Sequence, residues 1–393
     1  MEQKIGPYSI ALVSDFFCPN AGGVETHIYF LAQCLINLGH RVVVVTHGYG
    51  DRKGVRYLSN GLKVYYLPFI VAYNGATLSS IIGSMPWLRK VFLRENVQII
   101  HGHSYSLINV DQIICVSYTS KENTVLRGKL DPNKVSTIPN AIETSLFTPD
   151  TDQFFKNPTT IIFLGRLVYR KGADLLCEIV PKVCARHKTV RFIIGGDGPK
   201  RIELEEMREK YNLHSRVVML GMLPHNQVKQ VLNQGQIFIN TSLTEAFCMS
   251  IVEAASCGLH VVSTRVGGVP EVLPIDEFIS LEEPVPDDLV EALLKAVEKR
   301  EKGKLMDPYK KHEAVSKMYN WPDVAERTQV IYQKAVETGS PGRLDRLKGY
   351  YDQGIGFGIL YIVVACIIIF WLKILDIFDP PAKNRLKEKP KSQ

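Results

Sequence analysis

Two glutamates, eight positions apart, are the first side chains in this sequence whose types and spacing could do chemistry. Glu245 follows a run of threonine and serine residues that could cap a helix, and Glu253 lies later in that predicted helix, which ends at Gly258. Eight residues rise about 12 Å along a helix, so the two carboxylates could hold two separate hydroxyl-bearing parts of one extended ligand. The other interpretation is an acid that complements the helix dipole and a surface glutamate.

Two cations form a second candidate group. Arg166 and Lys171 lie in a glycine-bounded run, 165–172, between a predicted strand and a predicted helix. Arginine can bind a phosphate through two parallel hydrogen bonds and lysine binds it as a point charge, so the pair could neutralise a diphosphate leaving group. A basic, solvated turn is the alternative.

A pair of glycines occupies a similar place nearer the N-terminus. Gly22 and Gly23 stand between the first predicted strand and the first predicted helix, where free helix amides can receive a phosphate. The run is not Gly-x-Gly-x-x-Gly, and the second predicted strand ends at His47 without an acidic residue. Both features disfavour a nicotinamide-dependent dehydrogenase.

The strands and helices that would position these groups alternate in two successive series. Runs that are apolar throughout, such as 42–45, are typical of strands buried on both faces of a parallel sheet. The polar, proline-bearing stretch 144–159 separates the two series and is the expected linker. We therefore expect an α/β protein with two facing Rossmann-like domains, over residues 1–143 and 160–340.

Composition limits the classes of function. Lysine and arginine exceed aspartate and glutamate by 47 to 40, and the resulting net charge of +7 suits phosphate-bearing ligands or an anionic membrane surface. It does not by itself argue for nucleic acid. The eight cysteines include no Cys-x-x-Cys pair, so we expect reduced thiols in a cytosolic domain, without a disulfide framework or a zinc site.

The C-terminal region predicts a membrane anchor. Residues 354–372 carry no charge and are long enough to cross the hydrocarbon core, so we expect one transmembrane helix there, followed by a basic tail at 373–393. The cations of the tail favour a cytosolic tail under the positive-inside rule. The lack of an N-terminal signal and the unpaired thiols favour a cytosolic large domain, which is the orientation we expect.

A predicted helix at 78–94 could lie on the membrane surface. It carries Arg89, Lys90 and Arg94 beside aliphatic and aromatic residues, a composition typical of a helix on an anionic surface. The alternative is a helix packed within its domain and solvated at its ends.

The exact sequences of several motifs are more specific than the chemical types of their residues. Gly-Gly-Val after the first predicted strand, Arg-x(4)-Lys-Gly and Glu-x(7)-Glu together resemble the retaining GT-B glycosyltransferases with the Glu-x(7)-Glu signature. More narrowly, the runs 22–27 (GGVETH), 115–127 (CVSYTSKENTVLR) and 242–248 (SLTEAFC) resemble the catalytic subunits that add N-acetylglucosamine to phosphatidylinositol in the first step of glycosylphosphatidylinositol (GPI) anchor biosynthesis. The resemblance extends over essentially the whole chain.

The resemblance implies a hexosyltransferase that uses UDP-GlcNAc, needs no metal or other cofactor, and works with other subunits at the endoplasmic reticulum membrane. It implies that Arg166 and Lys171 hold the diphosphate, and that Glu245 contacts the sugar and Glu253 the ribose. The other donor-binding positions that it implies are Gly22, Gly23, Ala246 and Phe247.

One interval departs from the resembled family. Only eleven residues separate the predicted strands that end at His101 and begin at Ile113, too few for a parallel crossover with its helix. In the resembled family this interval holds a helix, a further strand and a histidine that faces the sugar. We therefore expect a shortened first domain near 103–112, and we assign the missing role to neither His101 nor His103. Two alternatives stay open: a UDP-sugar-binding subunit without turnover, and a transferase that acts on another lipid.

Overall fold

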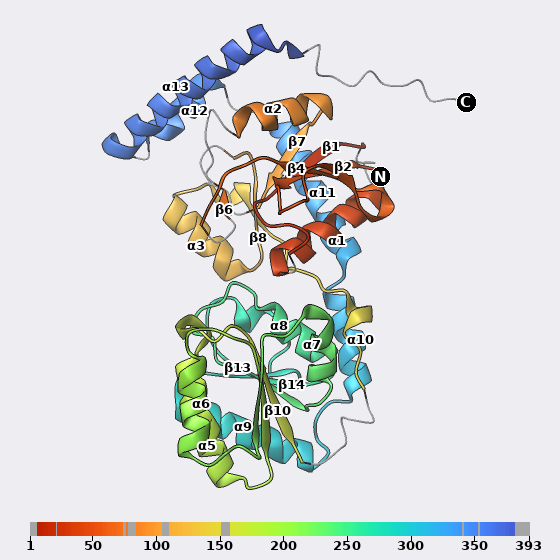
Figure 1. The fold of residues 1–393 in the computed structure, drawn as a ribbon, viewed down its shortest axis with the longest axis vertical. Helices are drawn as coiled ribbons and strands as arrows, with labels where there is room; N and C mark the ends of the chain where they lie inside the picture. Colours follow the sequence, from red (N-terminus) through yellow and green to blue (C-terminus); the bar gives the residue numbers. More distant parts are fainter. Residues whose placement is uncertain are drawn as a thin grey trace, which may run out of the picture. The chain divides into compact units, whose positions relative to one another are not determined.

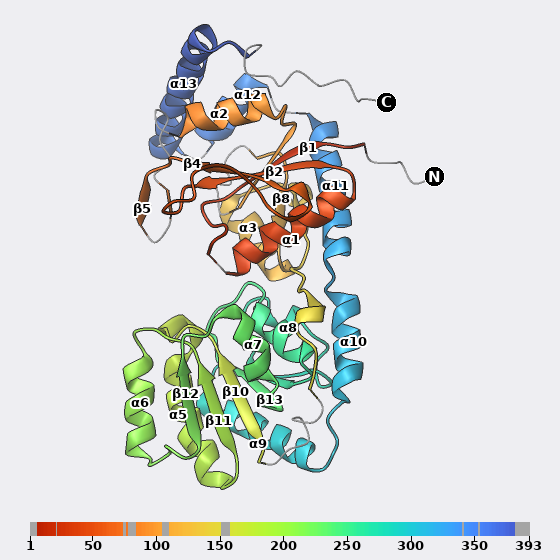
Figure 2. The same cartoon turned by 45° about the vertical axis from the view of Figure 1, so that its right-hand side comes forward.

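The computed structural model describes residues 6–20, 22–73, 76–77, 84–103, 110–150, 158–339, 342–352 and 354–381. The chain forms two compact units (Figures 1 and 2). The first unit comprises Met1–Ile113 and Pro322–Gln393, and the second comprises Ile114–Trp321.

The chain enters the second unit before the linker that the sequence predicts at 144–159. Helix α3 (Tyr118–Gly128), expected in the first domain, belongs to the second unit. The Glu271 carboxylate accepts hydrogen bonds from the backbone amides of Tyr118 at 2.5 Å and Thr119 at 2.8 Å. An acidic side chain of the second unit therefore satisfies amides at the N-terminus of α3 and fixes this helix there.

A five-stranded sheet in the order β3-β4-β2-β1-β7 forms the centre of the first unit. All neighbouring strands are parallel except β3, which is antiparallel to β4. The strands are β1 (Ser9–Val13), β2 (Arg41–His47), β3 (Gly54–Tyr57), β4 (Lys63–Leu67) and β7 (Ile99–Gly102). Valines 42–45 of β2 are at most 6% exposed, which confirms the prediction of a strand buried on both faces.

Helices cover this sheet. α2 (Met85–Arg94) packs Val91 against Val13 and Val43, and α1 (Gly23–Asn37) buries Ile28 and Leu31. A second chain segment, α11 (Trp321–Thr338), returns to the same unit.

Strand β7 lies at one edge of the first sheet. Within the described residues no strand pairs with its outer side, and β8 (Ile113–Cys115) pairs with β9 (Val135–Thr137) in a separate two-stranded sheet. The shortening expected near 103–112 falls mainly on residues 104–109, which lie outside the described residues.

The second unit is built on a parallel six-stranded sheet in the order β12-β11-β10-β13-β14-β15. The strands are β10 (Thr160–Leu164), β11 (Arg191–Gly195), β12 (Val217–Gly221), β13 (Ile237–Asn240), β14 (His260–Thr264) and β15 (Ile279–Glu282). Its helices are α5 (Ala173–Arg186), α6 (Arg201–Lys210), α7 (His225–Leu232), α8 (Met249–Ser256), α9 (Pro286–Glu301) and α10 (Pro308–Met318).

Alternation along these strands divides the core of the second unit into two layers. Ile161 of β10 packs with α5, α6 and α9, whereas the next residue, Ile162, packs with α7, α8 and α10. The sheet therefore has helices on both faces, as the all-apolar strands predict.

The C-terminal segment forms α12 (Arg343–Tyr351) and α13 (Ile355–Phe378). In the part of the chain that the structure describes, α13 is the one helix long and apolar enough to cross a membrane. It extends beyond the predicted span at 354–372 and includes Asp376 near its C-terminus.

Candidate functional site

The candidate site of the second unit lies where β10 and its neighbour β13 end. The loop from β10 to α5 carries Arg166 and Lys171, and the loop from β13 to α8 carries Glu245. Both loops leave the carboxyl ends of parallel strands, the edge at which open α/β sheets bind ligands.

Backbone contacts join the two loops. The Thr241 hydroxyl donates to the carbonyl of Lys171 at 2.9 Å, and the Leu243 amide donates to the carbonyl of Arg170 at 2.9 Å. Gly172 has φ +69°, and a Cβ there would lie 1.7 Å from the Thr241 carbonyl oxygen. Only glycine permits this approach, so the position of the Lys171 backbone relative to Thr241 is fixed.

The side chains of Lys171 and Glu245 meet in an ion pair. The Lys171 Nζ contacts Glu245 Oε1, and the Ser242 hydroxyl donates to the same oxygen at 2.9 Å. The lysine side chain is 23% exposed and the glutamate side chain 13%. The pair is therefore partly withdrawn from water but still reachable by a ligand.

Glu245 does not lie on the helix that the sequence predicts. α8 begins at Met249, so Glu245 belongs to the preceding loop, and the prediction that Glu245 and Glu253 share one helix is wrong. The hydroxyls expected to cap the helix have other partners: Thr241 binds the β10–α5 loop, and Ser242 binds Asn240 and Glu245.

A third loop supports Glu245 from the other side. The Gly268 amide donates to the carbonyl of Glu245 at 3.0 Å, and a Cβ at Gly268 would lie 2.1 Å from the carbonyl oxygen of Ala246. Sequence reasoning did not assign a role to this glycine. The signal for it was the Gly267-Gly268 pair after β14, which marks a close backbone approach.

Arg166 differs from Lys171 in its surroundings. Its side chain is exposed, and among the described residues no ion pair or side-chain hydrogen bond involves it. A free guanidinium at the end of a parallel strand is well suited to a phosphate.

Glu253 lies on α8 without a hydrogen-bond partner for its carboxylate among the described residues. Burial raises the pKa of this carboxyl to about 7, because desolvation disfavours the charged form. Phe247 is 4% exposed and packs against the Tyr319 ring at 5.5 Å between centroids, so its side chain belongs to the core. Only its backbone is left for a ligand.

The glycine pair belongs to the first unit and is described separately. α1 begins at Gly23, and Gly22 precedes it in an extended conformation. A Cβ at Gly22 would lie 2.5 Å from a carboxylate oxygen of Glu25, whereas a Cβ at Gly23 would meet nothing within 4 Å.

His101 and His103 also lie in the first unit. The His101 Nδ1 lies 2.7 Å from the Tyr332 hydroxyl, and burial lowers the pKa of His101 to about 4. The two histidine rings stack on each other with centroids 4.5 Å apart. His101 is therefore neutral at physiological pH.

The three cations of α2 are not equivalent. Arg89 is 10% exposed, and its guanidinium donates to Asp376 Oδ1 at 2.6 Å and to the carbonyl of Asp379 at 2.8 Å. It is therefore engaged by the end of α13, which the sequence could not indicate. Lys90 and Arg94 are exposed.

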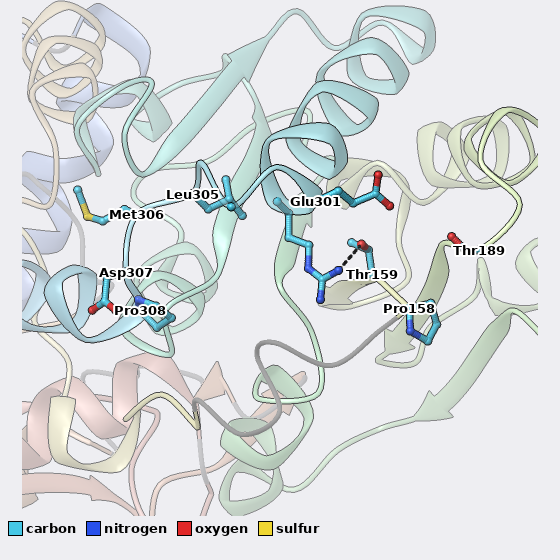
Figure 3. Close-up of a pocket in the computed structure, with 10 residues that line it drawn as sticks. Pro158, Thr159, Thr189, Glu301, Leu305, Met306, Asp307 and Pro308 are labelled. Carbon is cyan, nitrogen blue, oxygen red and sulfur yellow. Dashed lines mark hydrogen bonds between the residues drawn. The ribbon is translucent and has the colours of Figure 1, made fainter.

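A cavity of about 960 Å³ lies elsewhere on the second unit. Arg300, at the end of α9, donates a hydrogen bond from Nη1 to the Thr159 Oγ1 at 3.4 Å. Figure 3 shows Thr159 and Pro158 among the residues that line the cavity. Thr159 directly precedes β10, so this cavity lies at the amino ends of the strands, opposite the edge with Arg166 and Lys171. Its size does not make it the ligand site.

Comparison with known proteins defines the class. Residues 148–313 match the family model of glycosyl transferases group 1. Solved structures that resemble the chain include sucrose-phosphate synthase from Thermosynechococcus elongatus (TM-score 0.68, 18% identity, 84% of this chain and 100% of that chain). Another is Anabaena Alr3699/HepE in complex with UDP and glucose (TM-score 0.66, 15% identity, 83% and 99%). The fold is therefore that of the GT-B glycosyltransferases, as the sequence motifs predict.

Closer relatives define the family. The chain is 48% identical to the phosphatidylinositol N-acetylglucosaminyltransferase A subunit of Homo sapiens, over 95% of this chain and 87% of that protein. It is 45% identical to the Arabidopsis thaliana protein of the same name, over 94% and 92%. Residues 47–125 match the family model "PIGA (GPI anchor biosynthesis)". The chain belongs to the family of phosphatidylinositol N-acetylglucosaminyltransferase A subunits.

The same comparison supports an internal shortening. The alignment with the human protein spans 423 positions, whereas 95% of 393 residues is about 373, so about 50 positions have no counterpart in this chain.

The close approach at Gly172 makes a prediction about stability. We expect Gly172→Ala to lower the free energy of unfolding by roughly 3 kcal/mol or more, because the new Cβ overlaps the Thr241 backbone at a positive φ. The control is Gly303→Ala, where φ is +64° but no atom lies within 4 Å, and we expect roughly 1 kcal/mol there. Urea unfolding measures both, and equal losses would show that the contact with Thr241 is unimportant.

Proposed function

We propose that this chain transfers N-acetylglucosamine from UDP-GlcNAc to the inositol of phosphatidylinositol, the first step of GPI-anchor biosynthesis. Relatives that are 40–48% identical over 94–95% of the chain carry the name of this enzyme's subunits. The structural observation that carries the proposal is the ion pair between Lys171 and Glu245 at the carboxyl ends of neighbouring strands, on two loops of which one also carries Arg166.

The two cations act on the leaving group in this proposal. Negative charge develops on the diphosphate as the bond to the sugar breaks, and preorganised cations stabilise that charge most effectively. The exposed guanidinium of Arg166 and the ammonium of Lys171 supply two positive charges, so the proposal needs no metal and no further cofactor. Gly22 and Gly23 offer helix amides that suit a phosphate.

The carboxylates act on hydroxyl groups. Glu245, with the adjoining backbone of Ala246 and Phe247, accepts hydrogen bonds from the hydroxyls of the transferred sugar. Glu253, which has no described partner, accepts hydrogen bonds from the ribose. Transfer proceeds with retention of configuration, as the Glu-x(7)-Glu signature implies.

The acceptor requires a membrane, and two features support one. α13 is long and apolar enough to span it, and α2 exposes Trp87 together with Lys90 and Arg94. We propose that this face of α2 contacts anionic lipid at the endoplasmic reticulum, with the two units in the cytosol and other subunits alongside. Arg89, bound to Asp376, is not part of that face.

A second candidate function is a UDP-sugar-binding subunit without turnover. The observation that favours it is the shortening of about 50 positions relative to the human protein, together with the unpaired outer side of β7 among the described residues. A third candidate, transfer to a different lipid, is separated from the first by analysis of the product.

Replacing the active-site lysine tests for turnover. We expect Lys171→Ala to reduce GlcNAc transfer about a hundredfold or more, because one charge on the leaving diphosphate is no longer neutralised. The assay measures radiolabel transfer from UDP-GlcNAc to phosphatidylinositol in microsomes that lack the native subunit. The control variant, Lys182→Ala, removes a surface lysine that pairs with Asp287. This variant should transfer GlcNAc as the wild type does.

Three outcomes of that assay are distinct. Wild-type activity with a large loss in Lys171→Ala supports the proposal. Wild-type inactivity despite UDP-GlcNAc binding supports the subunit without turnover. A large fall in melting temperature of Lys171→Ala with normal donor affinity would show that Lys171 is structural.

The raised pKa of Glu253 predicts a pH dependence of donor binding. The ionised carboxylate accepts hydrogen bonds from ribose hydroxyls better than the protonated form, so the KM for UDP-GlcNAc should fall as the pH rises through about 7. Glu253→Gln should have a high KM that varies little over this range. A KM that is independent of pH in the wild type, or an unchanged slope in the variant, contradicts the assigned role.

Vesicle flotation tests the face of α2. With a chain that ends at residue 339, to remove α13, we expect Lys90→Gln with Arg94→Gln to reduce binding to anionic vesicles about thirtyfold, since each of the two cations near the surface contributes roughly 1 kcal/mol. The control is Lys53→Gln with Arg56→Gln, which removes two exposed cations elsewhere on the first unit. Equal effects of the two pairs would mean that α2 is not the contact.

A further inference from the structure

We infer that the ion pair between Lys171 and Glu245 is a latch, which the diphosphate of a nucleotide-sugar opens and which re-forms to expel the free nucleotide diphosphate. This inference rests on the proposed function, because it concerns the same donor. In this inference, the ion pair makes the site bind UDP-GlcNAc in preference to UDP.

Backbone contacts position the two loops that carry the ion pair, so the pair does not depend on the chance proximity of two long side chains. Gly172 and Thr241 fix the loop that carries Lys171, and the Gly268 amide holds the carbonyl of Glu245. The lysine ammonium and the glutamate Oε1 therefore meet without large side-chain rearrangement, which lowers the entropic cost of the pair.

A ligand phosphate at Lys171 competes with Glu245 for the same ammonium. Arg166, exposed and unpaired among the described residues, has no such competitor. The diphosphate can therefore bind Arg166 without loss, whereas its contact with Lys171 requires the ion pair to be weakened or broken.

The ligand decides whether Glu245 finds new partners. Once Lys171 turns to the diphosphate, the Glu245 side chain, 13% exposed, retains only the hydrogen bond from Ser242 at 2.9 Å. Sugar hydroxyls can donate to it, whereas UDP offers none at this place. A partly buried carboxylate without its cation is costly, so UDP binds at a penalty that UDP-GlcNAc does not incur.

A different role for Glu245 predicts the opposite change in the affinity for UDP. If Glu245 merely held Lys171 in position for the phosphate, removing the carboxylate charge would weaken the binding of UDP. If the pair is a latch, removing the charge frees Lys171 and strengthens it. The affinity of UDP for a Glu245 variant therefore separates the two.

The experiment measures UDP and UDP-GlcNAc binding by titration calorimetry on the full chain in detergent. We expect Glu245→Gln to bind UDP about fivefold more tightly than the wild type, the factor expected for release of one partly exposed ion pair. We expect no tightening of UDP-GlcNAc, because the glutamine loses the charged contact with the sugar. The control, Glu291→Gln, removes one negative charge that pairs with Arg186 on the surface and should leave both affinities unchanged.

A double variant checks the cause. In Lys171→Ala with Glu245→Gln the gain for UDP should vanish, because there is no lysine to release. Glu245→Ala serves as a second single variant, and thermal unfolding shows which variants are folded. Weaker or unchanged UDP binding in the folded Glu245 variants overturns the latch alone. A wild-type chain that binds neither UDP nor UDP-GlcNAc overturns the proposed function, and the latch with it.

Discussion

The site depends on the approach of two backbones at Gly172 and Thr241. Because a Cβ at Gly172 would lie 1.7 Å from the Thr241 carbonyl oxygen, this spacing exists only with glycine. It brings the loops after β10 and β13 together and so places Lys171 beside Glu245. The third loop makes a similar close approach at Gly268, where a Cβ would collide with the carbonyl oxygen of Ala246. The close backbone contacts at these two glycines therefore position the side chains of Lys171 and Glu245.

The two glutamates of the signature have different environments. Glu245 is compensated by a cation and a hydroxyl, so its charge is supported before a ligand arrives. Glu253 has no such support among the described residues, and burial raises its pKa to about 7. In our proposals, competition for Lys171 controls the first carboxylate and protonation controls the second. Spacing along the sequence could not reveal this, because the difference arises from neighbours on other loops.

Much of the fold can be predicted from the sequence, but the contacts that individual side chains make cannot. The valines of 42–45 predict a doubly buried strand because no polar face interrupts them, and the Arg-x(4)-Lys-Gly run predicts cations at a strand end. The predicted position of Glu245 was wrong because the hydroxyls before it could equally cap a helix or join another loop, and tertiary contacts decided for the loop. Likewise, nothing local to Arg89 indicates that Asp376, far along the chain, engages it.

The four charged residues proposed to bind the donor belong to one unit. Arg166, Lys171, Glu245 and Glu253 all lie in the second unit, whose six-stranded sheet is continuous and covered on both faces. The shortening expected near 103–112 lies after β7, in the first unit. Within the described residues, the contacts around Lys171 join segments of the second unit alone. The contacts proposed for the donor therefore come mainly from the second unit, while Gly22 and Gly23, which are proposed to offer helix amides to a phosphate, belong to the first.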